Sequence, residues 1–583
     1  MEAAEWLRRF GSALEKGDIN AAADMFEPEG FWRDLVALTW NLKTCEGRAE
    51  IKAMLAATLA GARPRNFAAR SAEWFTFETA VGRGVGHMRF RDKGRHCWTL
   101  LTTLQELKGF EEKAGAQRET GILQGQTWLD KRIQESAELG VVRQPYVLIV
   151  GGGQGGIALA ARLKRLQVPA LVVEKNERAG DSWRKRYRSL CLHDPVWYDH
   201  MPYLPFPDHW PVFSPKDKIA DWLEMYARVM ELDYWGSTLC KRARYDEAAG
   251  AWEVLVMRGG QPHTLRPTHL VLATGMSGFP NIPAIEGIQD FERAGGTVVH
   301  SSQYGAGVQW KGKRCVVLGA GTSAHDICAD LCEQGAESVT MIQRAPTIVA
   351  RSETLMDLAW GPLYSEQALA RGISTEIADL TVASVPHKVL PTLQQPVYAE
   401  MRKRDASLYE GLEKAGFQYT FGEDGSGIHT LYLRRGAGYY IETGASQMII
   451  DGKVKVKSGV SVKGIDQRTV TLSDGSELPA DLIVYATGYG SMNGWAADLI
   501  SQEVADKVGK VWGLGSDTKA DPGPWVGELR NMWKPTQAEN LWFHGGNLMQ
   551  SRHYSLYLAL QLKARMEGID TPVYYVEPVH HLQ

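Results

Sequence analysis

Three glycines at a fixed spacing are the first residues of this chain with a chemical meaning. Gly151, Gly153 and Gly156 stand in G-x-G-x-x-G register between an apolar run at residues 146–150 and a helix-like segment at 157–166. In this arrangement the first glycine allows a tight turn, the second lets the backbone approach a pyrophosphate, and the third lets the helix pack on the strand. The helix N-terminus offers free N–H groups to the pyrophosphate. The stretch therefore predicts a dinucleotide-binding site.

The residues that follow indicate which dinucleotide binds there. An apolar run at 170–173 leads to Glu174, whose carboxylate can accept hydrogen bonds from a ribose 2′-OH and would repel a 2′-phosphate. Segment 178–215 is crowded with Trp, Tyr, His and Pro, and we interpret it as a wall around a flat, ring-shaped cofactor. Lys175 and Trp183 are assigned to cofactor binding with Glu174.

A second glycine motif begins about 170 residues later. A strand-like run at 314–318 precedes a G-x-G-x-x-A pattern, in which Ala324 takes the packing position of the third glycine. A helix-like segment follows, as in the first motif. We assign four residues of this motif to cofactor binding: Gly319, Gly321, Thr322 and Ser323.

The end of the next strand distinguishes the second site from the first. The run at 338–342 ends in Gln343-Arg344, so an arginine stands where the first site has an acid. A guanidinium suits a 2′-phosphate, and this site should therefore prefer NADPH to NADH. The alternative for Arg344 is a solvated surface arginine.

Two dinucleotide sites of opposite charge imply two different dinucleotides. NADPH delivers hydride, and an isoalloxazine is the acceptor that also requires an ADP-binding fold. We therefore expect FAD at the first site and NADPH at the second. The tripeptide ATG at 273–275 and the sequence ATGY at 486–489 are interpreted as exits from strands where the chain crosses between the two domains. Thr487 and Gly488 are also assigned to cofactor binding.

Composition excludes several classes of protein. The chain has 583 residues, 44% of them hydrophobic and 23% charged, as in soluble globular proteins. A net charge of -3 gives no signature of nucleic-acid binding. We find no segment with the ~20 apolar residues that cross a bilayer. The seven cysteines are scattered without a C-x-x-C pair, which favours a cytoplasmic protein and argues against a disulfide framework or a zinc site.

These motifs predict an α/β fold with two Rossmann-like dinucleotide-binding domains after a small α+β domain. We expect the small domain at 1–135, the first part of the FAD-binding domain at 145–290 and its second part at 481–583. The NADPH-binding domain should occupy 291–480, with an insertion at 345–460.

Coarser patterns predict the elements that lie outside the two motifs. In the first domain we expect helices at 6–14, 31–40 and 51–59, followed by antiparallel strands between 73 and 107. In the insertion we expect a helix at 397–415 and strand material at 439–449.

The first quarter of the chain resembles the nuclear-transport-factor-like, or SnoaL-like, cone. The resemblance rests on helices that precede a curved sheet and on the text from Gly17 to Leu55. It implies a domain that can hold a ligand, catalyse, or only mediate association, including a possible homodimer. Asp34 and His87 could form an acid–base pair in such a cone, but we favour packing and association.

From about Pro145 onward the chain resembles class B flavin-dependent monooxygenases, in their flavin-containing and YUCCA-like branch. The carrying motifs are GGGQGG at 151–156, GDSW at 180–183, GAGTSA at 319–324 and ATGY at 486–489.

The family fingerprint F-x-G-x-x-x-H-x-x-x-[FY] is met in part. Gly296, His300 and Tyr304 fit its spacing, whereas Ala294 stands where the family has an aromatic residue. The text LCLHDP at 190–195 is closer to the YUCCA-like pattern.

This resemblance implies a reaction. Reduced FAD would combine with O2 to a C4a-hydroperoxide, which oxygenates a soft N or S nucleophile or attacks a 2-oxo acid or ketone. His193, which could hydrogen-bond near the flavin, and Tyr304 of the fingerprint are the catalytic candidates. A sealed site slows loss of the peroxide to water, and the aromatic segment could supply that seal. An NADPH-dependent flavin oxidase or reductase and a non-catalytic scaffold are the alternatives.

Overall fold

The N-terminal part of the chain forms one mixed six-stranded sheet. The structure is a computed structural model that describes residues 3–91, 95–121, 124–514 and 527–579. The strand order is β2-β1-β6-β5-β4-β3, with β1 and β6 parallel and the other neighbours antiparallel. The strands are β1 (Phe26–Leu35), β2 (Leu42–Glu46), β3 (Arg65–Ala69), β4 (Trp74–Glu78), β5 (Gly82–Phe90) and β6 (Cys97–Leu107).

Helices of this part pack against the sheet. Helices α1 (Ala3–Glu15), α2 (Ile19–Asp24) and α3 (Gly47–Ala62) contact β1 and β3. Trp6 and Phe10 stack on each other in the core between the helices and the sheet, with ring centroids 4.7 Å apart. The predicted helices around Trp6 and at 51–59 are confirmed.

The predicted helix at 31–40 is wrong, because this segment is a strand followed by a turn. Residues 31–35 pair with both β2 and β6, so their backbone groups are satisfied by strands distant in the chain. Asp34 then accepts hydrogen bonds from the N–H groups of Leu38 and Thr39, which folds the next residues into a turn. Pairing across the sheet outweighs the local helix pattern.

Two parallel five-stranded sheets form the rest of the framework, as predicted for an α/β fold with two Rossmann-like domains. The first has the order β27-β13-β7-β8-β9 and the second β15-β25-β16-β17-β21. Strands of the first are β7 (Val147–Val150), β8 (Ala170–Val173), β9 (Tyr234–Trp235), β13 (His269–Leu272) and β27 (Leu541–Phe543). Strands of the second are β15 (Thr297–His300), β16 (Arg314–Leu318), β17 (Ser338–Gln343), β21 (Val454–Ser458) and β25 (Leu482–Tyr485).

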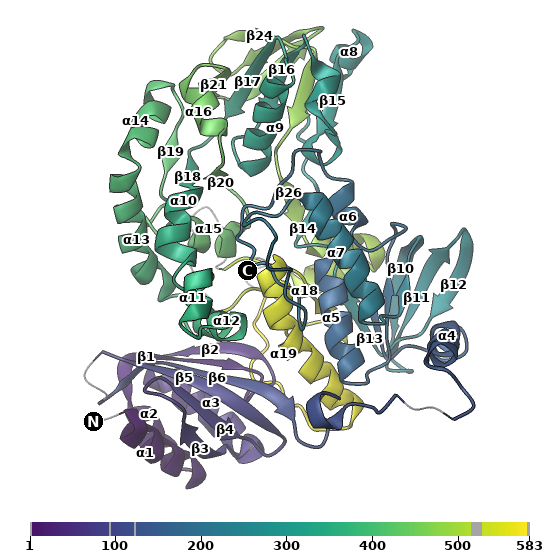
Figure 1. Cartoon of the computed structure of the whole chain (residues 1–583), viewed down its shortest axis with the longest axis vertical. Coiled ribbons are helices and arrows are strands. Elements are labelled where there is room, and N and C mark those ends of the chain that lie inside the picture. The colour runs from purple at the N-terminus through teal and green to yellow at the C-terminus, as the bar shows by residue number, and fades with distance from the viewer. Residues whose placement is uncertain (1–2, 92–94, 122–123, 515–526, 580–583) are drawn as a thin grey trace.

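Each parallel sheet carries the helix that its glycine motif predicts. Helix α5 (Gln154–Arg165) follows β7 and packs on α19 (Leu548–Met566), and α9 (Thr322–Glu333) follows β16. Figure 1 shows α19 between the first sheet and the N-terminal sheet. Helix α7 (Lys216–Val229) contacts α5 from another side.

A block of helices and short strands separates β17 from β21. Its strands are β18 (Thr347–Arg351), β19 (Tyr419–Thr420) and β20 (Tyr439–Glu442). Its helices are α10 (Ser352–Leu355), α11 (Glu366–Ala370), α12 (Thr375–Ala383), α13 (Leu390–Arg404), α14 (Ala406–Lys414), α15 (Gly427–Arg435) and α16 (Ala445–Ile450). The predicted helix at 397–415 is confirmed as α13 and α14. The prediction at 439–449 is only half right, because β20 is followed by α16.

The remaining elements are short. One antiparallel sheet comprises β10 (Thr238–Asp246), β11 (Ala251–Arg258) and β12 (Gln261–Leu265). A second comprises β22 (Val462–Asp466), β23 (Thr469–Leu472) and β24 (Glu477–Pro479). A two-stranded pair joins β14 (Ser277–Pro280) to β26 (Tyr489–Ser491). The other helices are α4 (Trp128–Glu138), α6 (Asp181–Arg184), α8 (Ile288–Arg293), α17 (Asn493–Leu499) and α18 (Gln502–Val508).

The N-terminal unit is joined to the rest of the chain by a shared core and by its polar contacts. Its apolar core is continuous with that of the first parallel sheet. Arg33 of β1 forms a buried ion pair with Glu528, at 2.7 Å between Nε and Oε1. Figure 1 shows α12 and α19 beside the N-terminal sheet, on the side away from α1 and α3.

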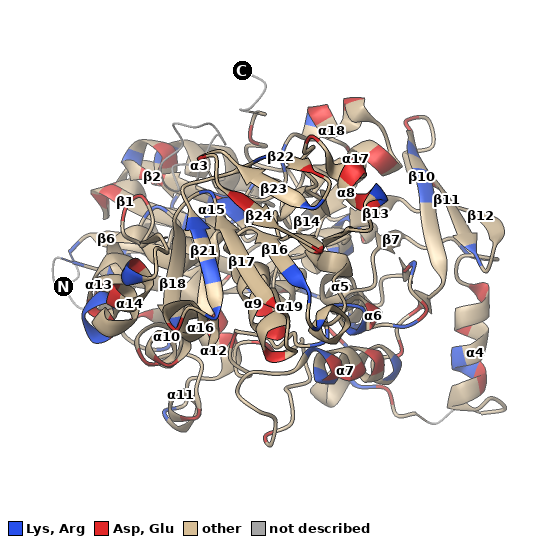
Figure 2. Ribbon diagram, turned by 90° about the horizontal axis from the view of Figure 1, so that it is seen from above, with Lys and Arg blue, Asp and Glu red and all other residues tan. Residues whose placement is uncertain are grey.

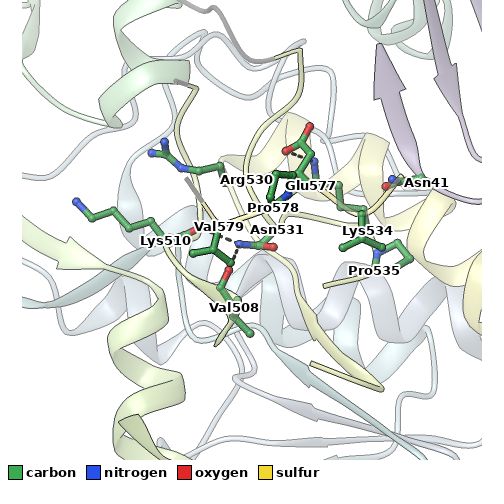
Figure 3. Close-up of a pocket in the computed structure, with 11 residues that line it drawn as sticks. Asn41, Val508, Lys510, Arg530, Asn531, Lys534, Pro535, Glu577, Pro578 and Val579 are labelled. Carbon is green, nitrogen blue, oxygen red and sulfur yellow. Dashed lines mark hydrogen bonds and ion pairs between the residues drawn. The ribbon is translucent and has the colours of Figure 1, made fainter. Parts of the chain in front are cut away.

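The C-terminal tail adds a second connection. Asn41 donates to the carbonyl oxygens of Tyr574 and Tyr575, and Lys534 Nζ lies 3.5 Å from Glu577 Oε2. Figure 3 shows this region, whose cavity of about 20 Å³ is too small for a cofactor. The tail therefore ties the N-terminal unit to the segment around Lys534.

The surface carries charges of both signs. Figure 2 shows Lys and Arg interspersed with Asp and Glu along the outer helices, such as α4 and α7. Within the described ranges, no helix has both the length and the apolar character needed to cross a membrane.

Candidate active site

The three glycines of the first glycine loop have different structural roles. Gly151 has φ +111°, and a Cβ there would lie 2.3 Å from the Ala273 carbonyl oxygen. A Cβ at Gly156 would lie 1.9 Å from the Gly151 carbonyl oxygen, so this glycine lets α5 pack on β7. Gly153 is the N-cap of α5, and the nearest atom to a Cβ there would be Ser182 Oγ at 3.8 Å. No atom therefore crowds the N-terminus of this helix, where a pyrophosphate would bind.

The acid at the end of β8 is joined to this loop. Glu174 is buried, and its Oε2 accepts a hydrogen bond of 2.7 Å from the N–H of Gly152. Its Oε1 accepts from the backbone N–H of Asn176 at 2.8 Å and from its side-chain amide at 2.7 Å. Glu174 therefore holds the shape of the loop from the position where a ribose would lie. Its neighbour Lys175 is exposed, with Nζ 5.9 Å from the centre of the Trp495 ring.

The second glycine loop repeats this division. Gly319 has φ +130°, and a Cβ there would lie 2.3 Å from the Ala486 carbonyl oxygen. Gly321 is the N-cap of α9, and the nearest atom to its Cβ would be the Tyr439 carbonyl oxygen at 3.7 Å. The buried Ala324 occupies the packing position. Space again remains at a helix N-terminus.

Arg344 stands free at the end of β17. Its side chain is exposed and makes no hydrogen bond or ion pair with any described residue. It also lines the large cavity of the molecule. Arg344 is therefore available to an anionic ligand at the carboxyl end of this sheet.

A cavity of about 780 Å³ is lined by residues next to the first glycine motif and by residues of the second. The first set includes Gln154, whose Oε1 accepts a 3.2 Å hydrogen bond from Trp183 Nε1, and Asn547 at the start of α19. Nine of the predicted site residues line the cavity: Trp183, His193, Gly319, Gly321, Thr322, Ser323, Arg344, Thr487 and Gly488. The other six lie outside its wall: Gly151, Gly153, Gly156, Glu174, Lys175 and Tyr304.

His193 lies in the wall formed by the aromatic segment. Its ring meets that of Tyr439 edge to face, with centroids 6.0 Å apart. Its Nε2 lies 4.0 Å from Asp194 Oδ1. The imidazole therefore faces both an aromatic ring and a carboxyl group at the cavity.

Tyr304, by contrast, is placed away from the cavity. Its buried hydroxyl donates to Asp330 Oδ2 at 3.0 Å, and the N–H of Gly307 donates to the same oxygen at 2.6 Å. Burial and the neighbouring Asp330 raise the pKa of Tyr304. In this geometry the hydroxyl of Tyr304 ties its loop to α9, and the catalytic assignment of Tyr304 stays a prediction. His300 has a similar bracing role, with Nε2 3.2 Å from the Gly488 carbonyl oxygen.

Two acids that sequence analysis did not single out also line the cavity. These are Asp194 and Asp199, and burial raises the pKa of both carboxyl groups. Asn547 donates to the hydroxyl of Tyr198 at 3.1 Å beside them. Both acids lie in the aromatic segment at 178–215, but only the fold brings them together with α19.

The imagined acid–base pair of the N-terminal unit does not form. Asp34 accepts four hydrogen bonds: from the backbone N–H groups of Leu38 and Thr39, and from the hydroxyls of Thr39 and Thr102. His87 packs edge to face against Trp74, with ring centroids 4.5 Å apart. Burial lowers the pKa of His87 to about 3. Both residues are therefore parts of the packed interior.

The two loops fit dinucleotides by their shape and by their unpaired polar groups. A Cβ at Gly153 or at Gly321 would meet one atom at ordinary van der Waals distance, so protein atoms do not crowd either helix N-terminus. Thr274 Oγ1, which adjoins the turn at Gly151, is buried without a hydrogen-bond partner among the described residues. A ligand hydroxyl or phosphate would satisfy such an atom.

Comparison with known proteins identifies sequence relatives. A family model described as Flavin-binding monooxygenase-like matches residues 175–360. Indole-3-pyruvate monooxygenase YUCCA1 of Oryza sativa subsp. japonica is 30% identical over 385 residues, which cover 65% of this chain and 85% of that protein. Probable indole-3-pyruvate monooxygenase YUCCA7 of Arabidopsis thaliana is 31% identical over 352 residues, covering 59% and 74%.

Solved structures share the fold at lower identity. An open crystal structure of cyclohexanone monooxygenase superposes with a TM-score of 0.51 and 16% identity, over 73% of this chain and 88% of that one. A structure of OTEMO in complex with FAD and NADP gives a TM-score of 0.51 and 17% identity, over 73% and 86%. These two likenesses concern the arrangement of the chain alone.

Proposed function

The chain belongs to the flavin-binding monooxygenase-like family, and we propose that its large cavity is where two cofactors and a small organic substrate meet. The protein is an NADPH- and FAD-dependent monooxygenase. It transfers one oxygen atom of O2 to an organic substrate. When bound, the flavin supplies hydride acceptance from NADPH and activation of O2.

One observation carries the proposal. A single cavity has Gln154 and Trp183 of the first motif region on its wall together with Gly321 and Arg344 of the second. A hydride donor and acceptor must come into contact, so the two dinucleotide sites have to open into one space. The cavity supports that arrangement.

We assign roles to the residues of the first site. Gly153 leaves room for the pyrophosphate at the N-terminus of α5, and Glu174 orients the loop and accepts from the ribose. Trp183 covers the cavity beside Gln154 and helps to exclude water.

The second site is assigned in the same way. Gly321, Thr322 and Ser323 would hold the pyrophosphate of NADPH, and Arg344 its 2′-phosphate. His193 would hydrogen-bond near the reacting centre, and Thr487 and Gly488 line the passage between the sites.

The test is oxygen incorporation by the purified protein. We expect yellow protein whose flavin absorbance is bleached by NADPH without O2, and a product that carries one atom from ¹⁸O2. Peroxide as the only product would instead indicate an NADPH oxidase, which is the alternative function. Colourless protein that FAD cannot reconstitute would contradict both.

Two substrate classes are proposed. A soft N or S nucleophile is one. A 2-oxo acid or ketone is the other, and it is included because the plant relatives are called indole-3-pyruvate monooxygenases. A panel of amines, sulfides, ketones and 2-oxo acids under NADPH turnover separates the two classes.

For the N-terminal unit we propose a SnoaL-like cone whose main task is association within the chain. The buried contact between Arg33 and Glu528 supports this role. A homodimer through the outer surface of the unit would appear in light scattering as twice the 64.7 kDa of one chain. The scattered thiols favour a cytoplasmic location, which fractionation of the source cells would test.

The division into units is proposed as well. We place the N-terminal unit at 1–135, the two parts of the FAD-binding domain at 145–290 and 481–583, and the NADPH-binding domain at 291–480 with its insertion at 345–460. Limited proteolysis should cut first between 109 and 128, which precede α4.

A further inference from the structure

A carboxyl group without a hydrogen-bond partner lies in the wall of the cavity. Asp199 is 1% exposed, and neither oxygen of its carboxyl accepts a hydrogen bond from the described residues; Oδ2 is fully enclosed. Leaving such a group unsatisfied is unfavourable, and more so when the group is charged. Because Asp199 lines the cavity, a ligand can supply the missing partner.

The chain does not supply that partner itself. Burial and Asp194 raise the pKa of Asp199, and the buried cation Arg552 only partly opposes this rise. Its guanidinium is already engaged, with Nε 2.8 Å from Asp379 Oδ2 and Nη2 2.7 Å from Asp379 Oδ1. Its remaining Nη1 donates to the carbonyl oxygens of Tyr198 and His200. Arg552 therefore fixes the backbone on either side of Asp199 and leaves the carboxyl free.

A second acid adjoins the first. Asp194 also lines the cavity, and its carboxyl makes no hydrogen bond with described residues; the imidazole Nε2 of His193 lies 4.0 Å from its Oδ1. The charge of Asp194 raises the pKa of Asp199. Two neighbouring carboxyl groups cannot both ionise cheaply unless a positive charge comes between them.

The cavity also carries two arginines, Arg344 at the end of β17 and Arg186, which follows Trp183. Neither forms a hydrogen bond or ion pair with Asp194 or Asp199 in the described part of the chain. We call the part of the wall that contains Asp194, Asp199 and Asn547 the acidic wall.

We propose that Asp199, assisted by Asp194, binds a protonated amine of the substrate and so selects amines over 2-oxo acids. The proposal rests on the proposed function, because it concerns the substrate of the same cavity. An ammonium group carries both the N–H donors and the positive charge that the two carboxyl groups lack. A 2-oxo acid would bring a third negative charge to the same wall.

The test uses the FAD-loaded full chain and three probes of similar size. Phenethylammonium, 2-phenylethanol and phenylpyruvate are titrated separately against the flavin absorbance at pH 7, where phenethylamine is protonated. We expect the parent protein to bind phenethylammonium at least about 10-fold more tightly than 2-phenylethanol, because the neutral alcohol cannot pair with a buried carboxylate as a cation does. Phenylpyruvate should bind the most weakly.

Asp199→Asn keeps the shape of the side chain and removes its charge. It should weaken phenethylammonium binding at least about 10-fold and leave 2-phenylethanol binding unchanged. Asp194→Asn should give a smaller loss. Asp208→Asn is the matched control, because Asp208 is fully exposed on the same segment, and its binding constants should equal those of the parent.

Two results would overturn the proposal: equal phenethylammonium affinity in Asp199→Asn and the parent, or tighter binding of phenylpyruvate than of phenethylammonium by the parent. The second result is obtained without any variant, so it decides the matter if Asp199→Asn does not fold. The flavin content of Asp199→Asn reports whether this variant has folded. Failure of the parent to be bleached would contradict the proposed function instead.

Discussion

Removal of the Arg344 side chain should change one property of the enzyme, its preference for NADPH over NADH. It is free of partners among the described residues and stands at the end of β17. Arg344→Ala should raise the KM for NADPH about 10- to 100-fold, because a hydrogen bond to a charged group is worth about 1.5–3 kcal/mol. The KM for NADH should stay the same. Both values can be measured from flavin reduction, with the exposed Arg228→Ala as control. Full preference for NADPH in Arg344→Ala would remove Arg344 from the site.

Substitutions at two glycines of the first loop should separate an effect on cofactor binding from an effect on folding. Gly153→Ala meets no atom closer than 3.8 Å, so the flavin-free protein should lose at most about 1 kcal/mol of stability, as expected for alanine at an N-cap. Its flavin content should nevertheless fall sharply, because the methyl group occupies the space left for the pyrophosphate.

Gly156→Ala is the contrasting variant. Its Cβ would lie 1.9 Å from the Gly151 carbonyl oxygen, and the flavin-free protein should lose about 1–3 kcal/mol or more. Chemical denaturation of flavin-free protein and absorbance of the purified variants measure both effects. If Gly153→Ala retained its full flavin content, the pyrophosphate would not lie at this helix N-terminus.

At the scale of elements, the sequence predicts best what depends on neighbours along the chain. The strands β7, β8, β16 and β17 were predicted because short buried runs in the order strand, glycine turn, helix and strand are a local signal. The strand β1 was mistaken for a helix because its partners lie up to 70 residues away. The acidic wall was missed for the same reason, since Asp199 and Asn547 meet only in the fold.

An ion pair between α12 and α19 supports the acidic wall, and its loss should loosen that wall. Arg552 and Asp379 are both buried, and Arg552 also holds the carbonyl oxygens of Tyr198 and His200. Asp379→Asn leaves Arg552 without its charge partner and should cost about 3–5 kcal/mol of stability. The KM for substrate should rise while the flavin content is kept. Urea denaturation and steady-state kinetics test this, with Asp208→Asn as control; an unchanged denaturation midpoint would contradict it.

At the scale of the whole molecule, the N-terminal unit behaves as part of the enzyme and not as an appendage. Its apolar core continues into that of the first parallel sheet, with α19 between them. The same helix begins at Asn547 in the cavity wall. Loss of the contact between the unit and the rest of the chain should therefore lower the stability of both.

The contact centres on Arg33 and Glu528, and its contribution can be measured by mutation and by pH. Their side chains are 1% and 3% exposed, and Glu528 also accepts from Thr44 Oγ1 at 2.8 Å. Glu528→Gln should cost about 3–5 kcal/mol, because it leaves Arg33 buried without its counter-charge. Arg33→Met with Glu528→Leu should cost less than the sum of the single variants, since no isolated charge remains.

The dependence on pH follows from the same pair. The charge of Arg33 holds the pKa of Glu528 well below its usual range, although burial opposes this. A depressed pKa stabilises the fold above the unfolded value of about 4.3, and this contribution is lost as pH falls through the folded pKa. Between pH 7 and pH 5 the free energy of unfolding should therefore differ between parent and Glu528→Gln by a constant amount. Below about pH 4 the difference should shrink, because the parent alone must protonate this carboxylate. Denaturation curves of both proteins at pH 7, 5, 4 and 3 measure this difference in the free energy of unfolding. A difference that grew on acidification would mean that the carboxylate is not stabilised by Arg33.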